Sequence, residues 1–156
     1  MKKLPPIEKV YEAYSAIADG RVKLFEDGAK VISSGGDKEY DVKWGRGEQG
    51  NDVYFSNDNA SYWQGYAGYP VIAVLMLKGK LPLDKSIMAM FKGANWAELN
   101  ASHRQNYSKA VQALLQQRNY GDEEAGRARL EAERVHKALS ELDIDIKRGK
   151  RAVKRR

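Results

Sequence analysis

The sequence predicts an α+β protein with an N-terminal helix, a small antiparallel β-sheet of three to four strands, a helical C-terminal half and a flexible basic tail. Apolar residues recur every three or four positions in residues 7–18, alternate with polar residues in 22–56, and return to helical spacing after residue 70. With 156 residues, 42% of them apolar, the chain is long enough for one compact domain with a helical appendage.

The N-terminal helix is expected to begin after Pro5-Pro6, because proline at a helix start sacrifices no needed N–H group. The apolar residues from Ile7 to Ile17 fall on one helical face, and Gly20 is a suitable terminator. We interpret Tyr11 and Tyr14 as core residues rather than as ligand-binding ones.

Residues 22–56 predict an antiparallel meander. Asp27-Gly28 is a strong hairpin signal between the first two strands. The glycine-rich stretch 45–52 is expected to be a second hairpin tip, because it lacks the Gly-Lys-Ser/Thr ending of a phosphate-binding loop. The strands are predicted at residues 22–24, 29–32, 39–44 and 53–56.

The stretch from Asp52 to Leu77 holds six of the fifteen aromatic residues and the longest apolar run. A short strand and turn lead into the aromatic, glycine-punctuated loop Ser61–Tyr69, after which Pro70 opens the run Val71–Leu77. We favour a buried helix for this run because of the proline at its start. A buried strand is the alternative, since short apolar runs are ambiguous by period alone.

This order of strand, turn, polar loop and helix resembles the SWIM zinc-finger pattern, C-x-C-x(n)-C-x-H. The resemblance covers residues 38–78 and places the metal ligands of that family at Tyr54, Ser56, Gly68 and Pro70. None of these residues makes a structural zinc site. The resemblance therefore implies a zinc-free module in which aromatic packing replaces the metal. That family's association with DNA-acting proteins and with protein interaction implies a role of the same kind.

The C-terminal half predicts several capped helices. Asp84 can cap a short helix, and Asn95 and Ser102 each precede a Glu or Gln by three residues, the spacing of a capping box. A last helix over residues 122–142 has a narrow apolar stripe that includes Leu130, Val135 and Leu139, and is otherwise charged. Residues 1–118 are thus taken as one domain, with this charged helix appended.

The sequence contains few candidate catalytic residues. We predict that the protein is not an enzyme and has no metal or cofactor. Cysteine is absent, which excludes disulfides and thiolate chemistry. His103 and His136 fall in different predicted helices, and no recognised catalytic motif is present. Asp52 and Asp58 flank a strand and are interpreted as turn formers rather than as Mg²⁺ ligands.

The basic charge is concentrated in the last ten residues. The formal net charge is +6, from 27 basic and 21 acidic residues, and seven of the basic residues lie in 147–156. Removing these seven leaves 20 basic residues against 21 acidic ones, so the body is electrically balanced. The tail has too little apolar surface to order itself. No long apolar segment is present, and we expect a soluble cytoplasmic protein.

We therefore predict a small non-catalytic accessory protein that binds DNA or RNA largely through phosphate contacts. Exposed aromatic side chains of the loop would add base stacking, and the candidates are Tyr62, Trp63 and Tyr66. The alternative is a protein-interaction module that docks on a larger protein, such as one of a nucleic-acid machine, through the aromatic loop and the charged helix. The candidate phosphate-binding residues are Lys147, Arg148, Lys150, Arg151, Lys154, Arg155 and Arg156.

Overall fold

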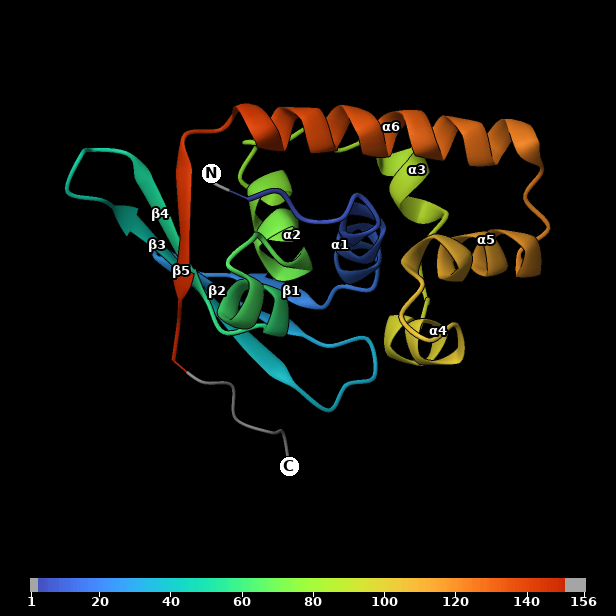
Figure 1. Cartoon of the computed structure of the whole chain (residues 1–156), viewed down its shortest axis with the longest axis horizontal. Helices are drawn as coiled ribbons and strands as arrows, with labels where there is room; N and C mark the ends of the chain where they lie inside the picture. Colours follow the sequence, from blue (N-terminus) through green and yellow to red (C-terminus); the bar gives the residue numbers. More distant parts are fainter. Residues whose placement is uncertain (1–2, 151–156) are drawn as a thin grey trace.

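The computed structural model describes residues 3–150, which form one mixed sheet with helices packed against it and beside it (Figure 1). The sheet has the order β1-β2-β3-β4-β5. Neighbours from β1 to β4 are antiparallel, and β5 is parallel to β4. The strands are β1 (Val22–Leu24), β2 (Gly28–Ile32), β3 (Glu39–Arg46), β4 (Asp52–Ser56) and β5 (Ile144–Arg148).

The α+β class and the helical C-terminal half are confirmed, but the sheet is larger than predicted. The prediction of three to four antiparallel strands missed β5, which returns to the sheet after the last helix. The helices are α1 (Lys9–Ala18), α2 (Tyr69–Leu77), α3 (Lys85–Ala89), α4 (Trp96–Ser102), α5 (Tyr107–Gln117) and α6 (Asp122–Glu141), and a single π-helical turn, η1 (Ala60–Gln64), precedes α2.

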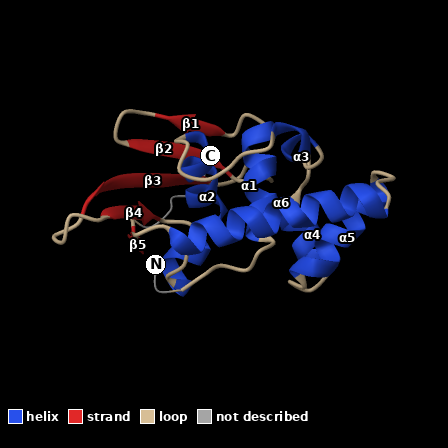
Figure 2. Cartoon of the chain, turned by 90° about the horizontal axis from the view of Figure 1, so that it is seen from above, coloured by secondary structure: helices blue, strands red, loops and turns tan. Residues whose placement is uncertain are grey.

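The apolar run after Pro70 is a helix, as favoured, and not a strand. Residues 70–76 of α2 are all buried, because this helix is enclosed between the sheet, α1 and α6. From above, α6 lies across α2 and α1, and α4 and α5 lie at the end remote from the strands (Figure 2). Helix α2 is therefore the centre of the core rather than a surface element.

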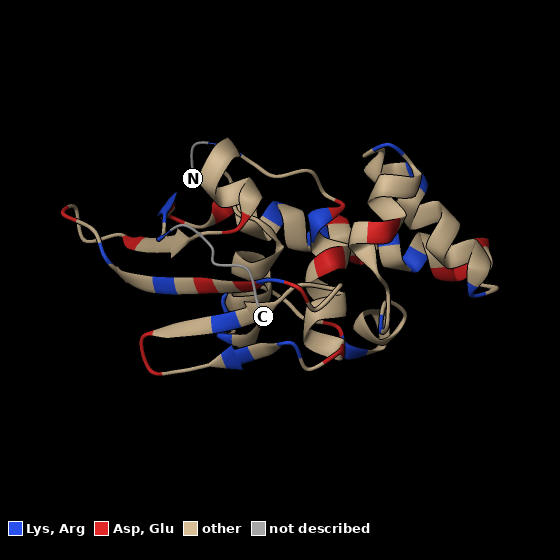
Figure 3. Ribbon diagram, turned by 90° about the horizontal axis from the view of Figure 1, so that it is seen from below, with Lys and Arg blue, Asp and Glu red and all other residues tan. Residues whose placement is uncertain are grey.

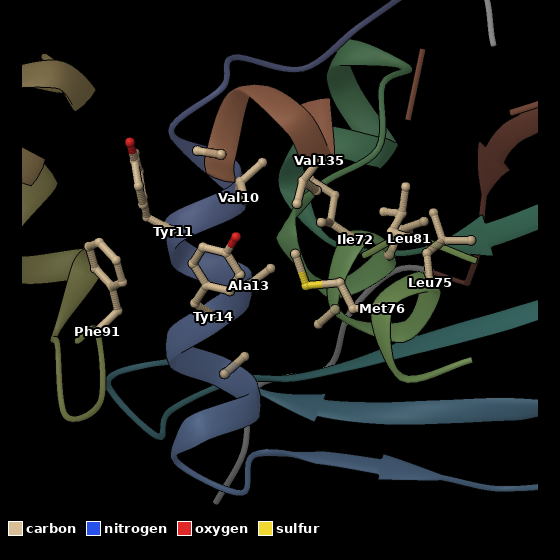
Figure 4. Close-up of a cluster of buried hydrophobic side chains, with 14 of the residues drawn as sticks. Val10, Tyr11, Ala13, Tyr14, Ile72, Leu75, Met76, Leu81, Phe91 and Val135 are labelled. Carbon is tan, nitrogen blue, oxygen red and sulfur yellow. The ribbon is translucent and has the colours of Figure 1, made fainter. Parts of the chain in front are cut away.

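Helix α1 lies between the sheet side and the α3–α5 side of the molecule, and its buried side chains connect the two parts of the core. Tyr14 is fully buried and lies toward Met76 of α2, while Tyr11 lies toward Phe91, with ring centroids 4.8 Å apart (Figure 4). Both tyrosines are core residues, as expected. On α6 the buried stripe is Ala128, Ala132, Val135 and Leu139.

Two local predictions are wrong. Leu130, which was placed in the apolar stripe of the last helix, is 69% exposed. Ser102 was expected to cap a helix but ends α4, since Arg104 and Gln105 adopt left-handed φ values of 53° and 63°. The side chain of Asn106 caps α5 instead, by accepting a bond from the backbone N–H of Lys109.

The disordered tail predicted for residues 147–156 is wrong for its first residues, and positions 151–156 lie outside the described residues. Lys147 and Arg148 belong to β5 and pair with Phe55 and Ser56 of β4, so they are not part of a disordered segment. This charged segment buries little apolar area. It is ordered because pairing with β4 supplies hydrogen bonds for its backbone. Within residues 3–150, the structure contains no helix with both the length and the apolar character needed to cross a membrane.

Candidate nucleic-acid interface

The outer face of the sheet exposes aromatic and basic side chains together. Strand alternation buries Ala29, Val31, Tyr40, Val42 and Tyr54 toward the helices. The intervening side chains then lie on the opposite face. Lys and Arg positions recur along these strands in Figure 3.

A row of directly opposed residues crosses this outer face. Gly28 of β2 lies opposite Lys43 of β3, Lys43 opposite Phe55 of β4, and Phe55 opposite Lys147 of β5. Lys43, Phe55 and Lys147 are exposed. Because opposed residues point to the same side of a sheet, the row places an aromatic ring between two ammonium groups.

A groove of about 850 Å³ follows this row from Gly28 to Phe55, and Lys147, opposite Phe55, lies beside it. Phe25, which is 46% exposed, lies along it, as does Phe55, which is 38% exposed. Gly28 contributes no side chain to the floor. The groove is lined by Phe25, Asp27, Gly28, Ala29, Lys30, Asp41, Val42, Lys43, Phe55, Arg148, Gly149 and Lys150.

The cations of the groove differ in how they are paired. Lys30 is held by two carboxylates, with its Nζ 3.1 Å from Glu39 and 3.0 Å from Asp41. Within the part of the chain that the structure describes, Lys43, Lys147 and Lys150 form no ion pair. These three ammonium groups are therefore available to phosphate oxygens, whereas Lys30 is largely neutralised in place.

Arg148 joins the groove to the aromatic loop. Its Nε donates a 2.8 Å hydrogen bond to the carbonyl oxygen of Tyr62. Its guanidinium carbon lies 4.9 Å from the ring centroid of Tyr62 and 5.7 Å from that of Trp63. Trp63 is 62% exposed and makes an edge contact with Tyr62 at 4.8 Å. Two sets of residues that were predicted separately, the basic residues and the loop aromatics, thus meet at Arg148.

Tyr66, the third predicted aromatic, faces the N-terminal segment instead. It is only half-exposed, and the Nζ of Lys3 lies 5.3 Å from its ring centroid. The same ammonium group lies 3.3 Å from the carbonyl oxygen of Gln64. Tyr66 is thus already covered by a cation, and Trp63 is the loop aromatic that is open to a partner.

Asp58 holds the aromatic loop in shape. Its carboxylate accepts a hydrogen bond from the hydroxyl of Ser56 and another, at 3.1 Å, from the N–H of Ser61, whose hydroxyl accepts from the N–H of Gly68. This confirms the interpretation of Asp58 as a turn former. Ser56 and Gly68, two of the positions that the SWIM resemblance assigns to ligands, both lie against this carboxylate. Residues 3–150 contain no group of three or more His, Asp or Glu side chains placed to hold a metal ion.

The predicted phosphate-binding residues divide into two groups. Lys147, Arg148 and Lys150 lie at the groove or the loop, as described above, whereas Arg151, Lys154, Arg155 and Arg156 fall outside the described residues. Phe25, Phe55 and Lys43 were missed. The alternation of Lys43 and Phe55 with buried neighbours was visible in the sequence, but their alignment in one row depends on strand register.

The family model described as uncharacterised conserved protein UCP014422 matches residues 2–145. No curated protein and no solved structure matches the chain. The matched region includes the aromatic loop and both phenylalanines of the groove, and ends inside β5.

Proposed function

The chain belongs to the family of the uncharacterised conserved protein UCP014422, and we propose that it is a non-catalytic accessory protein that binds single-stranded DNA or RNA. The observation that carries this proposal is the row Lys43–Phe55–Lys147 beside the Arg148–Trp63 contact. The row lies on the outer face of the sheet, whereas Arg148, opposite buried Ser56, contacts Trp63 on the other face of the same edge strand. Together they place exposed rings and cations on both sides of β5.

Single strands suit this surface better than duplexes. Bases can stack on exposed rings only when they are unpaired, and each such stack contributes roughly 1–3 kcal/mol. Phe25, Phe55 and Trp63 supply three rings, while Lys43, Lys147 and Lys150 stand close enough to the groove to meet the phosphates. Stacking on rings does not read base identity, so we propose binding with little sequence preference.

The basic residues beyond Lys150 are proposed to add affinity without adding selectivity. Cations that neutralise phosphates release condensed counterions, which makes binding weaker as salt concentration rises. Four such cations follow Lys150, namely Arg151, Lys154, Arg155 and Arg156. The folded body would therefore supply the preference for unpaired bases, and these residues would supply salt-dependent attraction.

The test measures fluorescence anisotropy of labelled oligonucleotides of equal length, as single-stranded DNA, single-stranded RNA and duplex DNA, at two salt concentrations. Phe55→Ala and Trp63→Ala should each weaken single-strand binding by roughly 5- to 100-fold. Arg127→Gln is the matched control, because Arg127 is an exposed cation on α6 that lines neither the groove nor the depression beside Phe55 and Lys147. This variant should bind nearly as the wild type does.

A second set of variants separates the body from the terminal residues. Replacing Arg151, Lys154, Arg155 and Arg156 together by Gln should reduce the salt slope by about 3, at roughly 0.7 for each cation on a single strand. Binding that disappears with these four cations, but is unchanged by Phe55→Ala and Trp63→Ala, would reject the sheet face as the site.

Protein docking is the second candidate, because α6 exposes an unpartnered apolar side chain. Leu130 is 69% exposed on the same helix as several charged residues. A partner would cover Leu130 together with polar neighbours, as interface cores do. The resemblance to a zinc-free SWIM module fits both candidates and stays a prediction.

A further inference from the structure

A second pocket lies on the other side of the sheet, between α1, the β2–β3 turn, the start of the aromatic loop and α4. Its volume is about 170 Å³, and it shares no lining residue with the groove. Eight of the thirteen lining residues are polar or charged, and the set comes from segments far apart in sequence: Lys9, Glu12, Arg21, Ser33, Ser34, Tyr40, Asp58, Asn59, Ala60, Tyr69, Trp96, Ala97 and Asn100.

Two buried charges of opposite sign meet in this pocket. Nζ of Lys9 lies 3.1 Å from Oε2 of Glu12, and both side chains are mostly buried. Removing charges from water costs several kcal/mol per ion, and replacing such pairs by apolar residues is often neutral or stabilising. Stability alone therefore does not account for this pair, and a concave site with buried ionisable groups is typical of ligand binding.

Arg21 has one nitrogen whose hydrogen-bonding capacity is unused. Its Nη1 donates a 2.6 Å bond to the carbonyl oxygen of Ile32, and its Nε approaches Asp19 at 3.4 Å. Its Nη2 is buried and has no acceptor among the described residues. A buried donor left unpaired costs free energy, and a guanidinium group is suited to the oxygen atoms of a carboxylate.

The charges that line the pocket disfavour a doubly charged ligand. Two cations, Lys9 and Arg21, are matched by two carboxylates, Glu12 and Asp58, and these acids would repel doubly charged phosphate more strongly than a monoanion. Ser33, Tyr40 and Asn100 offer further polar groups for a ligand's hydroxyl. At about 30 Å³ for each water molecule in the liquid, the volume corresponds to roughly six waters, which is the size of a short organic acid.

We propose that this pocket binds a short-chain hydroxycarboxylate, with the carboxylate held by Nη2 of Arg21 beside the Lys9 ammonium group. The ligand's hydroxyl lies toward Tyr40 and Asn100. This site is independent of the nucleic-acid surface, because the two share no residue.

The test uses the full chain labelled with 5-fluorotryptophan, which gives one fluorine resonance for each of its three tryptophans. Trp96 lines the pocket, whereas Trp63 lies in the aromatic loop and serves as an internal control. Lactate, glycolate and glycerate, which each carry one carboxylate, are titrated through the millimolar range, beside lactamide and inorganic phosphate. We expect at least one of the three acids to shift the Trp96 resonance saturably, with no change from lactamide or phosphate and none at Trp63.

Arg21→Gln should weaken this binding by roughly tenfold or more, since a hydrogen bond to a charged group is lost. Arg127→Gln is again the matched control and should leave the affinity unchanged, because Arg127 does not line this pocket. Because Arg21 also holds Ile32, its variant is checked for folding by circular dichroism. If the Arg21→Gln protein does not fold, the affinity of Tyr40→Phe is measured in its place. This change keeps the ring and removes a hydroxyl that lines the pocket, so it should weaken binding several-fold.

The proposal is overturned if none of the three acids shifts Trp96, or if lactamide shifts it equally. It is also overturned if phosphate replaces the acids as the ligand, or if a folded Arg21→Gln protein binds the acid as tightly as the wild type does. If the Arg21→Gln protein does not fold, an affinity that Tyr40→Phe leaves unchanged also overturns the proposal.

Discussion

Gly68 and Asp58 are packed so closely that a Cβ atom at Gly68 would lie 1.9 Å from Oδ2 of Asp58. The contact closes the aromatic loop, because the same carboxylate oxygen accepts from the N–H of Ser61 and the hydroxyl of Ser61 accepts from the N–H of Gly68. The shape of the Trp63 loop therefore depends on a residue with no side chain at position 68.

We predict that Gly68→Ala destabilises the protein by about 1–3 kcal/mol, because the added methyl group forces the Asp58 carboxylate out of its hydrogen bonds. Urea denaturation measures the free energy of unfolding. Gly126→Ala is the matched control: Gly126 lies inside α6 with open space around it, so the change should stabilise by about 0.5–1 kcal/mol. Equal effects of the two substitutions would show that the Asp58 contact does not constrain the loop.

Local sequence signals predicted much of the fold. The side chain of Asp84 accepts from the N–H groups of Ser86 and Ile87, and that of Asn95 accepts from the N–H of Glu98, as their positions before helices indicated. These signals are reliable because a cap depends on three or four consecutive residues. Ser102 had the same spacing, but the left-handed residues after it decided the outcome.

Strand β5 could not be predicted in the same way. Only Ile144 and Ile146 alternate there, next to a run of cations, and the partner strand lies about 90 residues earlier in the chain. Parallel pairing over such a separation has no local signature. For the same reason the contact between Arg148 and the Tyr62–Trp63 pair, which joins the two predicted sets of site residues, became visible only in the structure.

Strand β5 also determines where the chain can be shortened. A protein ending at Ile146 would lose the pairing of Lys147 and Arg148 with β4 and the bond from Arg148 to Tyr62. We predict that it unfolds at a lower temperature than a protein ending at Lys150, by about 2–4 °C for each kcal/mol lost. Thermal unfolding followed by circular dichroism compares the two, with the full chain as reference. Identical midpoints would mean that the end of β5 adds no stability.

Ser15 is predicted to be the most sensitive polar position of the core. Its hydroxyl accepts a 2.7 Å bond from Nε1 of Trp96 and donates to the carbonyl oxygen of Phe91, and all of these groups are buried. Ser15→Ala leaves the indole N–H without an acceptor and should cost about 1–3 kcal/mol.

The control for Ser15→Ala is Ser140→Ala, which removes an exposed hydroxyl from α6 and should stay within about 0.5 kcal/mol of the wild type. Urea denaturation gives both values, and near-ultraviolet circular dichroism reports on the Trp96 environment. A Ser15→Ala cost no larger than that of the control would show that the indole finds another acceptor.

Glu12 should make stability depend on pH in the direction opposite to that of an ordinary salt-bridged carboxylate. Burial raises the pKa of Glu12 above the reference value of 4.5, and the neighbouring Lys9 ammonium opposes that rise. The folded protein therefore holds this proton more tightly than the unfolded chain. The resulting stability is fully present below the unfolded pKa and is lost as pH rises through the folded one.

We predict that the wild type loses stability relative to the Glu12→Gln protein as pH rises from about 4 to 7. The free energy of unfolding of the variant minus that of the wild type should therefore become more positive. The change should be about 1.4 kcal/mol for each unit by which folding raises the pKa of Glu12. The difference isolates Glu12, because all other carboxylates are common to both proteins. Urea denaturation across this range measures it. Glu141→Gln, which removes an exposed carboxylate at the end of α6, should give a difference within about 0.5 kcal/mol. A Glu12→Gln difference that falls with pH would mean that attraction by Lys9 outweighs burial, and that the pocket holds a stable ion pair rather than a strained acid.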